Sequence, residues 1–298
     1  MSKVTYASDK GGYQTHVLMK SILIYIVLIF LTLICLVPIW ILLVNATREH
    51  NEIISKFSIS SLIPGSHLFE NIKTLKTNSL YKFFSPLLGL KNSLIVAGCC
   101  SALTVFFSGM TAYGLVVYDF KLKGPAFVFI LAVMMVPTQV TAVGFMRMLI
   151  QMKLLDSYIP LIIPSIAAPA IVFFMRQSML STFPLDIIEA ARIDGSNEFR
   201  TFLTISIPMM KPAFAVQAIF AFIQKWNDYY NQSIVLVSGK REQLTMPMMV
   251  QKVISIDRNP DFGANYAAIF LSIIPVVVVY VVLSKFIIGG VAAGGVKE

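Results

Sequence analysis

Polar side chains that could bind a solute gather in one short stretch of a very apolar chain, residues 224–232 (Gln-Lys-Trp-Asn-Asp-Tyr-Tyr-Asn-Gln). Amides and carboxylates pair with hydroxyl groups, while an aromatic ring covers the apolar face of a sugar. The stretch therefore suits a path or gate for a hydroxyl-rich solute. The alternative is an interface with a second membrane protein, or a tyrosine belt near the surface. The candidates are Gln224, Trp226, Asn227, Asp228, Tyr229, Tyr230 and Asn231, with Gln139 beside Pro137 as a further one.

A second polar segment, residues 184–208, has the residue types of two short helices joined by a bend. Pro184 suits the first turn of a helix, and Gly195 suits its end because glycine tolerates the left-handed conformation. Ser196 is expected to cap the second helix, and Pro208 to limit it. Ala190 and its neighbour Ala191 would leave a flat face for another protein. The alternative is that they pack against this chain's own spans.

Reactive clusters are not recognisable elsewhere in the sequence. The three cysteines all fall in apolar runs, where small packing residues are expected rather than metal ligands. No catalytic triad or carboxylate pair stands out, and no G-x-x-x-x-G-K-[ST] sequence is present. These patterns predict a non-catalytic protein with no metal site and no ATP-binding loop of its own.

The elements that position these segments are predicted to be membrane helices. Of the 298 residues, 57% are hydrophobic and 13% are charged, and the mean hydropathy is +0.77. A bilayer core of about 30 Å needs roughly 20 helical residues. Two runs, 21–44 and 93–118, lack any charged residue or histidine, and four more are interrupted but readable: 126–146, 159–175, 213–237 and 266–288.

Six long runs predict an all-helical integral membrane fold, because barrel strands would appear as short alternating segments. The first run is too long for a signal peptide and is interpreted as an anchor. Six spans place both termini on one side, but lysine and arginine are balanced between the two sides, so charge does not decide the orientation. The net charge of +9 belongs to segments that flank spans, and no nucleic-acid partner is predicted.

The polar segment 184–208 resembles the EAA motif of the inner-membrane permease subunits of ATP-binding cassette importers. The motif residues Glu189, Ala190, Ala191, Gly195, Ile205 and Pro208 keep the family spacing, and Ile207 stands where leucine is usual. The resemblance covers about residues 91–285. Several features resemble the carbohydrate, maltose-permease type of subunit: 137–139 (Pro-Thr-Gln), 190–195, 226–228 (Trp-Asn-Asp) and the tail 290–297, in which Ala292 replaces a frequent threonine and Gly295 a frequent alanine.

This resemblance implies a type I importer permease fold with six transmembrane helices, in which segment 184–208 is a cytoplasmic coupling helix that docks on an ATPase. The implied ATPase-coupling residues are Glu189, Ala190, Ala191, Arg192, Asp194, Gly195, Ile205 and Pro208. Implied partners are a second permease, a dimer of ATPases that bind ATP and Mg²⁺, an extracellular solute-binding protein, membrane lipid and a sugar. The implied location is the bacterial cytoplasmic membrane, with both termini in the cytoplasm.

The predicted organisation is a cytoplasmic tail (1–20), a first span with an outer loop (21–90), the permease core (91–289) and a second tail (290–298). Rival interpretations are an importer for another solute, such as an amino acid, peptide or glycerol derivative, and a secondary transporter. A secondary transporter would often show a repeated half, which this sequence lacks. A membrane-embedded enzyme would need a reactive cluster, and none is recognisable.

Overall fold

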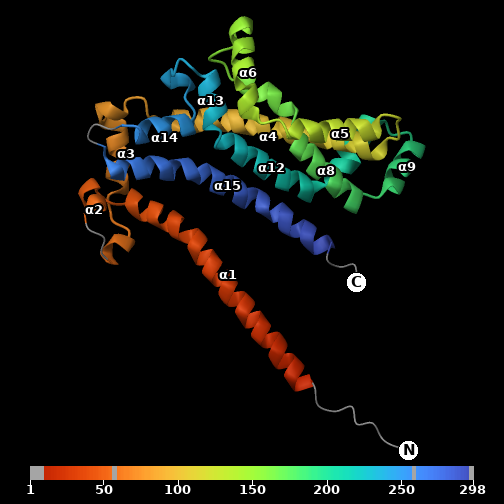
Figure 1. Ribbon diagram of the computed structural model, residues 1–298, viewed down its shortest axis with the longest axis horizontal. Helices are drawn as coiled ribbons and strands as arrows, with labels where there is room; N and C mark the ends of the chain where they lie inside the picture. The colour runs from red at the N-terminus through yellow and green to blue at the C-terminus, as the bar shows by residue number, and fades with distance from the viewer. Residues whose placement is uncertain (1–9, 56–58, 257–259, 295–298) are drawn as a thin grey trace, which may run out of the picture. The chain divides into compact units, whose positions relative to one another are not determined.

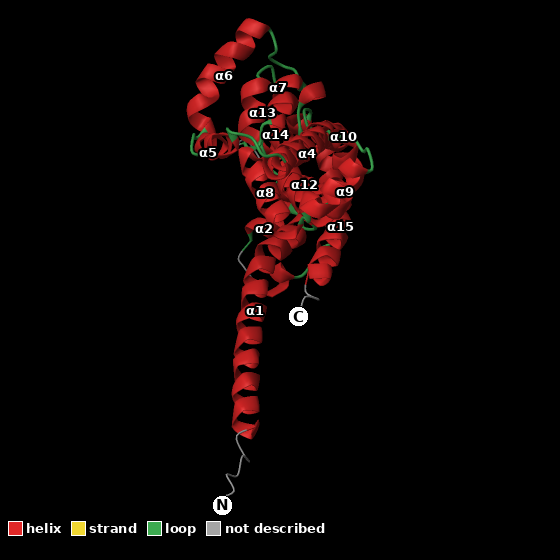
Figure 2. Ribbon diagram, turned by 90° about the vertical axis from the view of Figure 1, so that its right-hand side faces the viewer, coloured by secondary structure: helices red, strands yellow, loops and turns green. Residues whose placement is uncertain are grey.

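The computed structural model describes residues 10–55, 59–256 and 260–294, and within these ranges the chain forms helices and loops without a strand (Figure 1, Figure 2). The chain divides into two compact units. The smaller unit runs to Lys73 and includes Asp261–Phe270, and the larger unit comprises Thr74–Pro260 and the chain from Leu271 onward. The prediction of an all-helical membrane fold is confirmed.

The smaller unit contains the first apolar helix, α1 (Lys10–Ala46), followed by α2 (His50–Ile54), η1 (Ile59–Leu62) and the start of α3 (Leu68–Thr77). The most apolar stretch of α1 has no buried residue, as expected for a helix that contacts lipid. The segment after α1 is held by Asn71, whose side-chain amide donates to the carbonyls of Ala46 (2.9 Å) and Arg48 (2.8 Å). Helix α1 begins at Lys10, so it includes the second half of the segment 1–20 that was predicted to be a tail.

The larger unit is built around α4 (Pro86–Val117), which packs against α8 (Pro169–Thr182) and α12 (Lys211–Trp226) (Figure 1). Small residues allow close helix approach in membranes. Gly109 of α4 is one of them, because a Cβ atom placed there would lie 2.5 Å from the ring of Phe214 in α12. The predicted second span is thus the central helix of the unit.

The third predicted span is bent rather than continuous. Helices α5 (Lys123–Met134) and α6 (Thr138–Met152) meet at an angle of 93°, and Pro137 stands at the N-cap of α6. Proline lacks the N–H that would continue the helix. The predicted fourth span is confirmed as a stretch from Ile159 to Thr182, made of α7 (Ile159–Ile162), η3 (Ile163–Ile166) and α8.

The fifth predicted span, 213–237, is also not one helix. Helix α12 ends at Trp226, and α13 (Tyr229–Val235) follows after a break at Asn227 and Asp228. By length and apolar character, four described helices could cross a membrane, or six if each bent pair is one span; α12 then pairs with Glu198–Met209 across an 85° bend. The larger count equals the predicted six, but its fifth member includes Glu198–Met209, whereas the predicted span was 213–237.

The segment after α13 returns to the start of α4. Asn92 donates from its side-chain amide to the carbonyls of Glu242 and Leu244, both at 2.9 Å, and the Ser93 hydroxyl accepts from the backbone N–H of Met246 at 2.7 Å. Next come η5 (Arg241–Gln243), α14 (Met246–Ile254) and the long α15 (Phe262–Gly294), while η2 (Ser79–Tyr81) precedes α4. Of the predicted tail 290–298, residues 295–298 lie outside the described residues.

Candidate functional site

The polar segment 184–208 forms the predicted bent pair of helices. Helix α9 (Leu185–Ile193) begins directly after Pro184, and its end is closed by Gly195, which has a φ of +78°. The N–H of Gly195 donates to the carbonyl of Arg192 (3.0 Å), and the N–H of Ser196 donates to that of Ala191 (2.9 Å). Glycine is favoured at such a left-handed helix end. The predicted stop at Gly195 is confirmed.

The second helix of the segment is capped by a different residue from the one predicted. The side chain of Asn197, not Ser196, accepts from the N–H of Arg200 at 2.8 Å and opens α10 (Glu198–Thr201). Asparagine and serine cap helices about equally well, so residue type alone did not distinguish them. The Ser196 hydroxyl instead accepts from that of Thr201 (2.9 Å).

Beyond α10 the helix continues through a π-helical turn, η4 (Phe202–Ser206), and then α11 (Ile207–Met209). Pro208 lies one residue before the end of this helix at Met209, so the prediction that Pro208 limits the helix agrees with the structure. The direction changes one residue after Met209, at the 85° bend into α12. Ile205 is half-buried against the core, and Pro208 is exposed.

The two alanines of the motif face opposite ways. Ala191 is buried, whereas Ala190 is exposed beside the exposed Glu189. Ile188 of the same helix belongs to the core that includes residues of α4 and α8. The predicted flat face of two adjacent alanines is therefore wrong. Only Ala190 is available for contact with another protein.

Large apolar side chains project from the outer surface of this segment. Ile193 is 87% exposed and Phe199 57% exposed, one on each side of the Gly195 bend, and Leu203 is also exposed. Exposed apolar groups within a polar surface commonly mark a protein contact. These three side chains were not predicted as contact residues, although apolar residues on both sides of a predicted bend are a usable signal. Arg192 and Asp194 are exposed at the polar edge.

Charges in this segment are organised around Glu198. Its Oε1 atom accepts from Nε of Arg192 at 2.7 Å, and its Oε2 atom accepts from the hydroxyl of Tyr113, in α4, at 3.1 Å. The Arg192 guanidinium also lies 5.7 Å from the centre of the Tyr118 ring. The Arg192 guanidinium holds the pKa of the Glu198 carboxyl below its usual value. The carboxylate is therefore charged at neutral pH.

The stretch 224–232 is divided by the break between α12 and α13. Trp226 is buried: its ring stacks on Phe222 (centroids 5.5 Å apart), and its Nε1 donates to the carbonyl of Ser272 in α15 at 3.0 Å. Asp228 caps α13 by accepting from the backbone N–H (3.1 Å) and side-chain amide (2.9 Å) of Asn231. Asp228 also forms an ion pair with Lys225, with 3.7 Å between Nζ and Oδ2.

The remaining candidates in this stretch differ in exposure. The side chains open to the surroundings are Gln224, Asn227, Tyr229 and Tyr230, and Asn231 is half-buried. Gln139 is exposed in the first turn of α6. The break thus presents an amide and two phenols outward, while Trp226 supports them from within.

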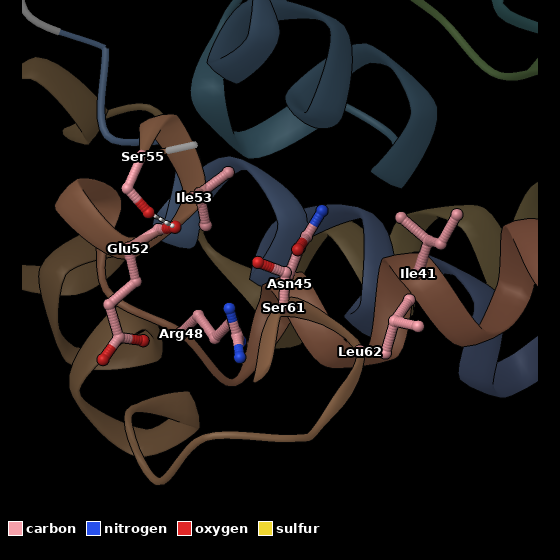
Figure 3. Close-up of a pocket in the computed structure, with 8 residues that line it drawn as sticks. All are labelled: Ile41, Asn45, Arg48, Glu52, Ile53, Ser55, Ser61 and Leu62. Atoms are coloured by element: carbon pink, nitrogen blue, oxygen red, sulfur yellow. Dashed lines mark hydrogen bonds between the residues drawn. The ribbon is translucent and has the colours of Figure 1, made fainter. Parts of the chain in front are cut away.

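Two hollows lie away from the stretch 224–232. The first, about 320 Å³, lies in the larger unit and is mainly apolar, lined by Ser101, Ala102, Val105, Phe106, Ile207, Phe214, Ala215 and Ala218. The second, about 220 Å³, lies in the smaller unit and is lined by Ile41, Asn45, Arg48, Glu52, Ile53, Ser55, Ser61 and Leu62 (Figure 3). Neither includes a predicted solute-path residue. Among the described residues, no group of three or more His, Cys, Asp or Glu side chains could hold a metal ion.

Comparison with known proteins decides the family. Residues 104–291 match the sequence model of the family described as binding-protein-dependent transport system inner membrane component. The chain belongs to this family. One relative is the arabinooligosaccharides transport system permease protein AraQ of Bacillus subtilis, to which the chain is 35% identical over 273 residues. The alignment covers 90% of this chain and 92% of that protein.

A second relative within the wider set of permeases is the sn-glycerol-3-phosphate transport system permease protein UgpE of Yersinia pestis. It is 29% identical over 272 residues, covering 91% of this chain and 95% of that protein. Among solved structures, a bacterial ABC transporter involved in the import of the acidic polysaccharide alginate matches with a TM-score of 0.73, at 20% identity, over 95% of this chain and 99% of that one. The predicted permease fold is thus confirmed, as is the resemblance to carbohydrate-type permeases.

Proposed function

We propose that this chain is the membrane-spanning permease subunit of an ATP-driven sugar or oligosaccharide importer. The observation that carries the solute class is the 35% identity, over nearly the whole chain, to a permease named for arabinooligosaccharides. The exposed amide and phenols at the α12–α13 break suit hydroxyl-rich solutes. A glycerol derivative is the second candidate, because the UgpE relative is named for sn-glycerol-3-phosphate.

The chain does no catalysis in this proposal. ATP and Mg²⁺ are bound by a dimer of partner ATPases, a second permease completes the path, and an extracellular binding protein delivers the solute. Segment 184–208 docks on the ATPase in the cytoplasm, with Glu189, Ala190, Arg192, Asp194 and the exposed apolar side chains Ile193, Phe199 and Leu203 at the contact. With six spans, both termini then lie in the cytoplasm of a bacterial cell.

The two hypotheses for the solute are separated by an uptake experiment. Cells that lack the chain are complemented with it, and uptake of radiolabelled arabinotriose and of sn-glycerol-3-phosphate is measured alongside calorimetry of the purified binding protein. Restored uptake of the first compound alone supports the oligosaccharide proposal, and restored uptake of the second alone supports the alternative. Ion-gradient-driven transport by this chain alone in liposomes would contradict both and indicate a secondary transporter.

A further inference from the structure

Four side chains from two distant parts of the sequence meet at the bend of segment 184–208. Tyr113 lies near the end of α4 and Tyr118 directly follows that helix, while Arg192 and Glu198 lie on either side of Gly195. The Glu198 carboxylate uses both oxygens, one for the Arg192 guanidinium (2.7 Å) and one for the Tyr113 hydroxyl (3.1 Å). One carboxylate therefore closes the bend and ties it to a transmembrane helix.

The attachment to α4 has an apolar part as well. Tyr113 is 3% exposed, and its ring centroid lies 5.4 Å from that of Phe202. The ring centroid of Phe202 lies in turn 5.8 Å from that of Phe106 in α4. Both the ring and the hydroxyl of Tyr113 thus contact the segment. The backbone connects segment 184–208 to its neighbouring helices less directly. The connection to α8 passes through Phe183, which has an extended backbone, and the connection to α12 passes through the 85° bend.

We propose that the contact between Tyr113 and Glu198 is the joint through which displacement of segment 184–208 moves α4. The proposal rests on the proposed docking of this segment to an ATPase. Tyr113 and Glu198 are then positioning residues for energy coupling. Because α4 packs along both α8 and α12, moving α4 would shift the central helices of the unit together.

Arg192 and Tyr113 have separable roles in this joint. The Arg192 contact spans the Gly195 bend and keeps the shape of the segment, whereas the Tyr113 contact fastens the segment to α4. The double substitution Arg192→Glu with Glu198→Arg keeps opposite charges across the bend. It reverses the contact with Tyr113, because a guanidinium can only donate to the phenol oxygen, and adding Tyr113→Phe to the pair then removes that contact.

The test uses the complete transporter, with its companion permease, ATPase and binding protein, in proteoliposomes. Two quantities are measured: solute taken up per ATP hydrolysed, and hydrogen exchange of residues 184–208. For Tyr113→Phe we expect hydrogen exchange and ATPase binding like those of the wild type, and uptake per ATP lower by about threefold or more, as the loss of one hydrogen bond would allow. The matched control Tyr280→Phe, at an exposed phenol of α15, should leave both quantities unchanged.

The charge-swapped pair, with and without Tyr113→Phe, gives the second arm. Compared with Arg192→Glu alone, both versions should restore slow hydrogen exchange in the segment, while uptake per ATP should be lower with Tyr113→Phe than without it. Wild-type coupling in Tyr113→Phe, or equal coupling of the swapped pair with and without Tyr113→Phe, would overturn the joint. If Tyr113→Phe proves unstable in the native background, the comparison within the swapped pair decides. Failure of the ATPase to copurify with the wild-type permease would overturn the proposed docking and the joint together, whereas normal copurification with normal coupling in Tyr113→Phe overturns only the joint.

Discussion

Nε1 of Trp226, in the last turn of α12, donates a hydrogen bond of 3.0 Å to the backbone carbonyl of Ser272 in α15. This bond fastens α12 to α15 immediately before the chain breaks at Asn227. The buried side chain of Trp226 thus fixes the end of α12 against α15, and the polar side chains of the break follow directly after it.

Replacing Trp226 should destabilise the larger unit. We expect Trp226→Phe to cost about 1 kcal/mol through the lost hydrogen bond, and Trp226→Ala about 3–5 kcal/mol through the cavity that it leaves. Thermal unfolding of the purified protein in detergent measures the difference. Phe220→Ala, at an exposed site on the same helix, is the control. Equal unfolding midpoints for Trp226→Ala and Phe220→Ala would contradict the burial seen here.

Replacing Asn227 and Tyr230 by alanine tests the solute path. Both side chains are exposed at the break and make no contact that holds α13 in place, so folding and ATPase assembly should be preserved. Uptake should change severalfold, because amide and phenol groups would be lost from the path. Tyr280→Ala serves as the control for an exposed tyrosine. If uptake is unchanged, these residues belong to an interface or a surface belt instead.

Substitution of Gly195 should disturb the bend. A residue with a Cβ atom at a φ of +78° costs about 1–2 kcal/mol, although no neighbouring atom would obstruct it. Gly195→Asp should also uncouple ATP hydrolysis from uptake. Gly98→Ala is the control, since it lies in α4 with open space around it and alanine favours helix. Wild-type uptake in Gly195→Asp would count against the coupling role.

Asn92 should hold the segment after α13 against α4. Replacing it with leucine leaves the carbonyls of Glu242 and Leu244 without their donor, at a cost of about 1–3 kcal/mol. We expect faster tryptic cleavage next to Lys240 and Arg241. Leu87→Ala, at an exposed site on the same helix, should cleave like the wild type. Equal cleavage rates for both variants would show that the two hydrogen bonds are dispensable.

The contact between Glu198 and Arg192 predicts a pH dependence. Because the folded state lowers the pKa of Glu198, the carboxylate stabilises the fold fully above its unfolded pKa, near 4.3. This contribution is lost as the pH falls through the lower folded pKa. The unfolding midpoint of the wild type should therefore exceed that of Glu198→Gln at neutral pH, and the difference should shrink below about pH 4. A difference that does not depend on pH would exclude the carboxylate as its source.

Features that depend on local backbone rules were predictable from the sequence. The bend at Gly195 follows from the backbone freedom of glycine, and the apolar spans follow from hydropathy. The break before α6 has a visible signal in Pro137. The break at Asn227 and Asp228 has no such signal, because neither residue type prevents helix formation. A continuous fifth span was therefore expected.

Features that depend on contacts between distant residues were not predictable. Tyr113 and Glu198 are 85 residues apart, and no local pattern links a phenol in a span to a carboxylate in a polar segment. The different burial of Ala190 and Ala191 depends on what packs around α9 in the folded chain. Trp226 lies within a polar stretch and was therefore grouped with the solute-path candidates. Its burial becomes visible only from its packing and its hydrogen bond to Ser272 of α15.

The π-helical turn η4, between Glu198 and the bend into α12, has one residue more than an α-helical turn would have. Each residue of a helix rotates the chain by about 100°. Removing one residue from Phe202–Ser206 would therefore rotate Glu198 by that angle relative to α12 and away from Tyr113, with every side chain of the contact still encoded. Chain length across this turn is consequently constrained as strictly as residue identity, and a single-residue deletion here should be tolerated less well than most substitutions.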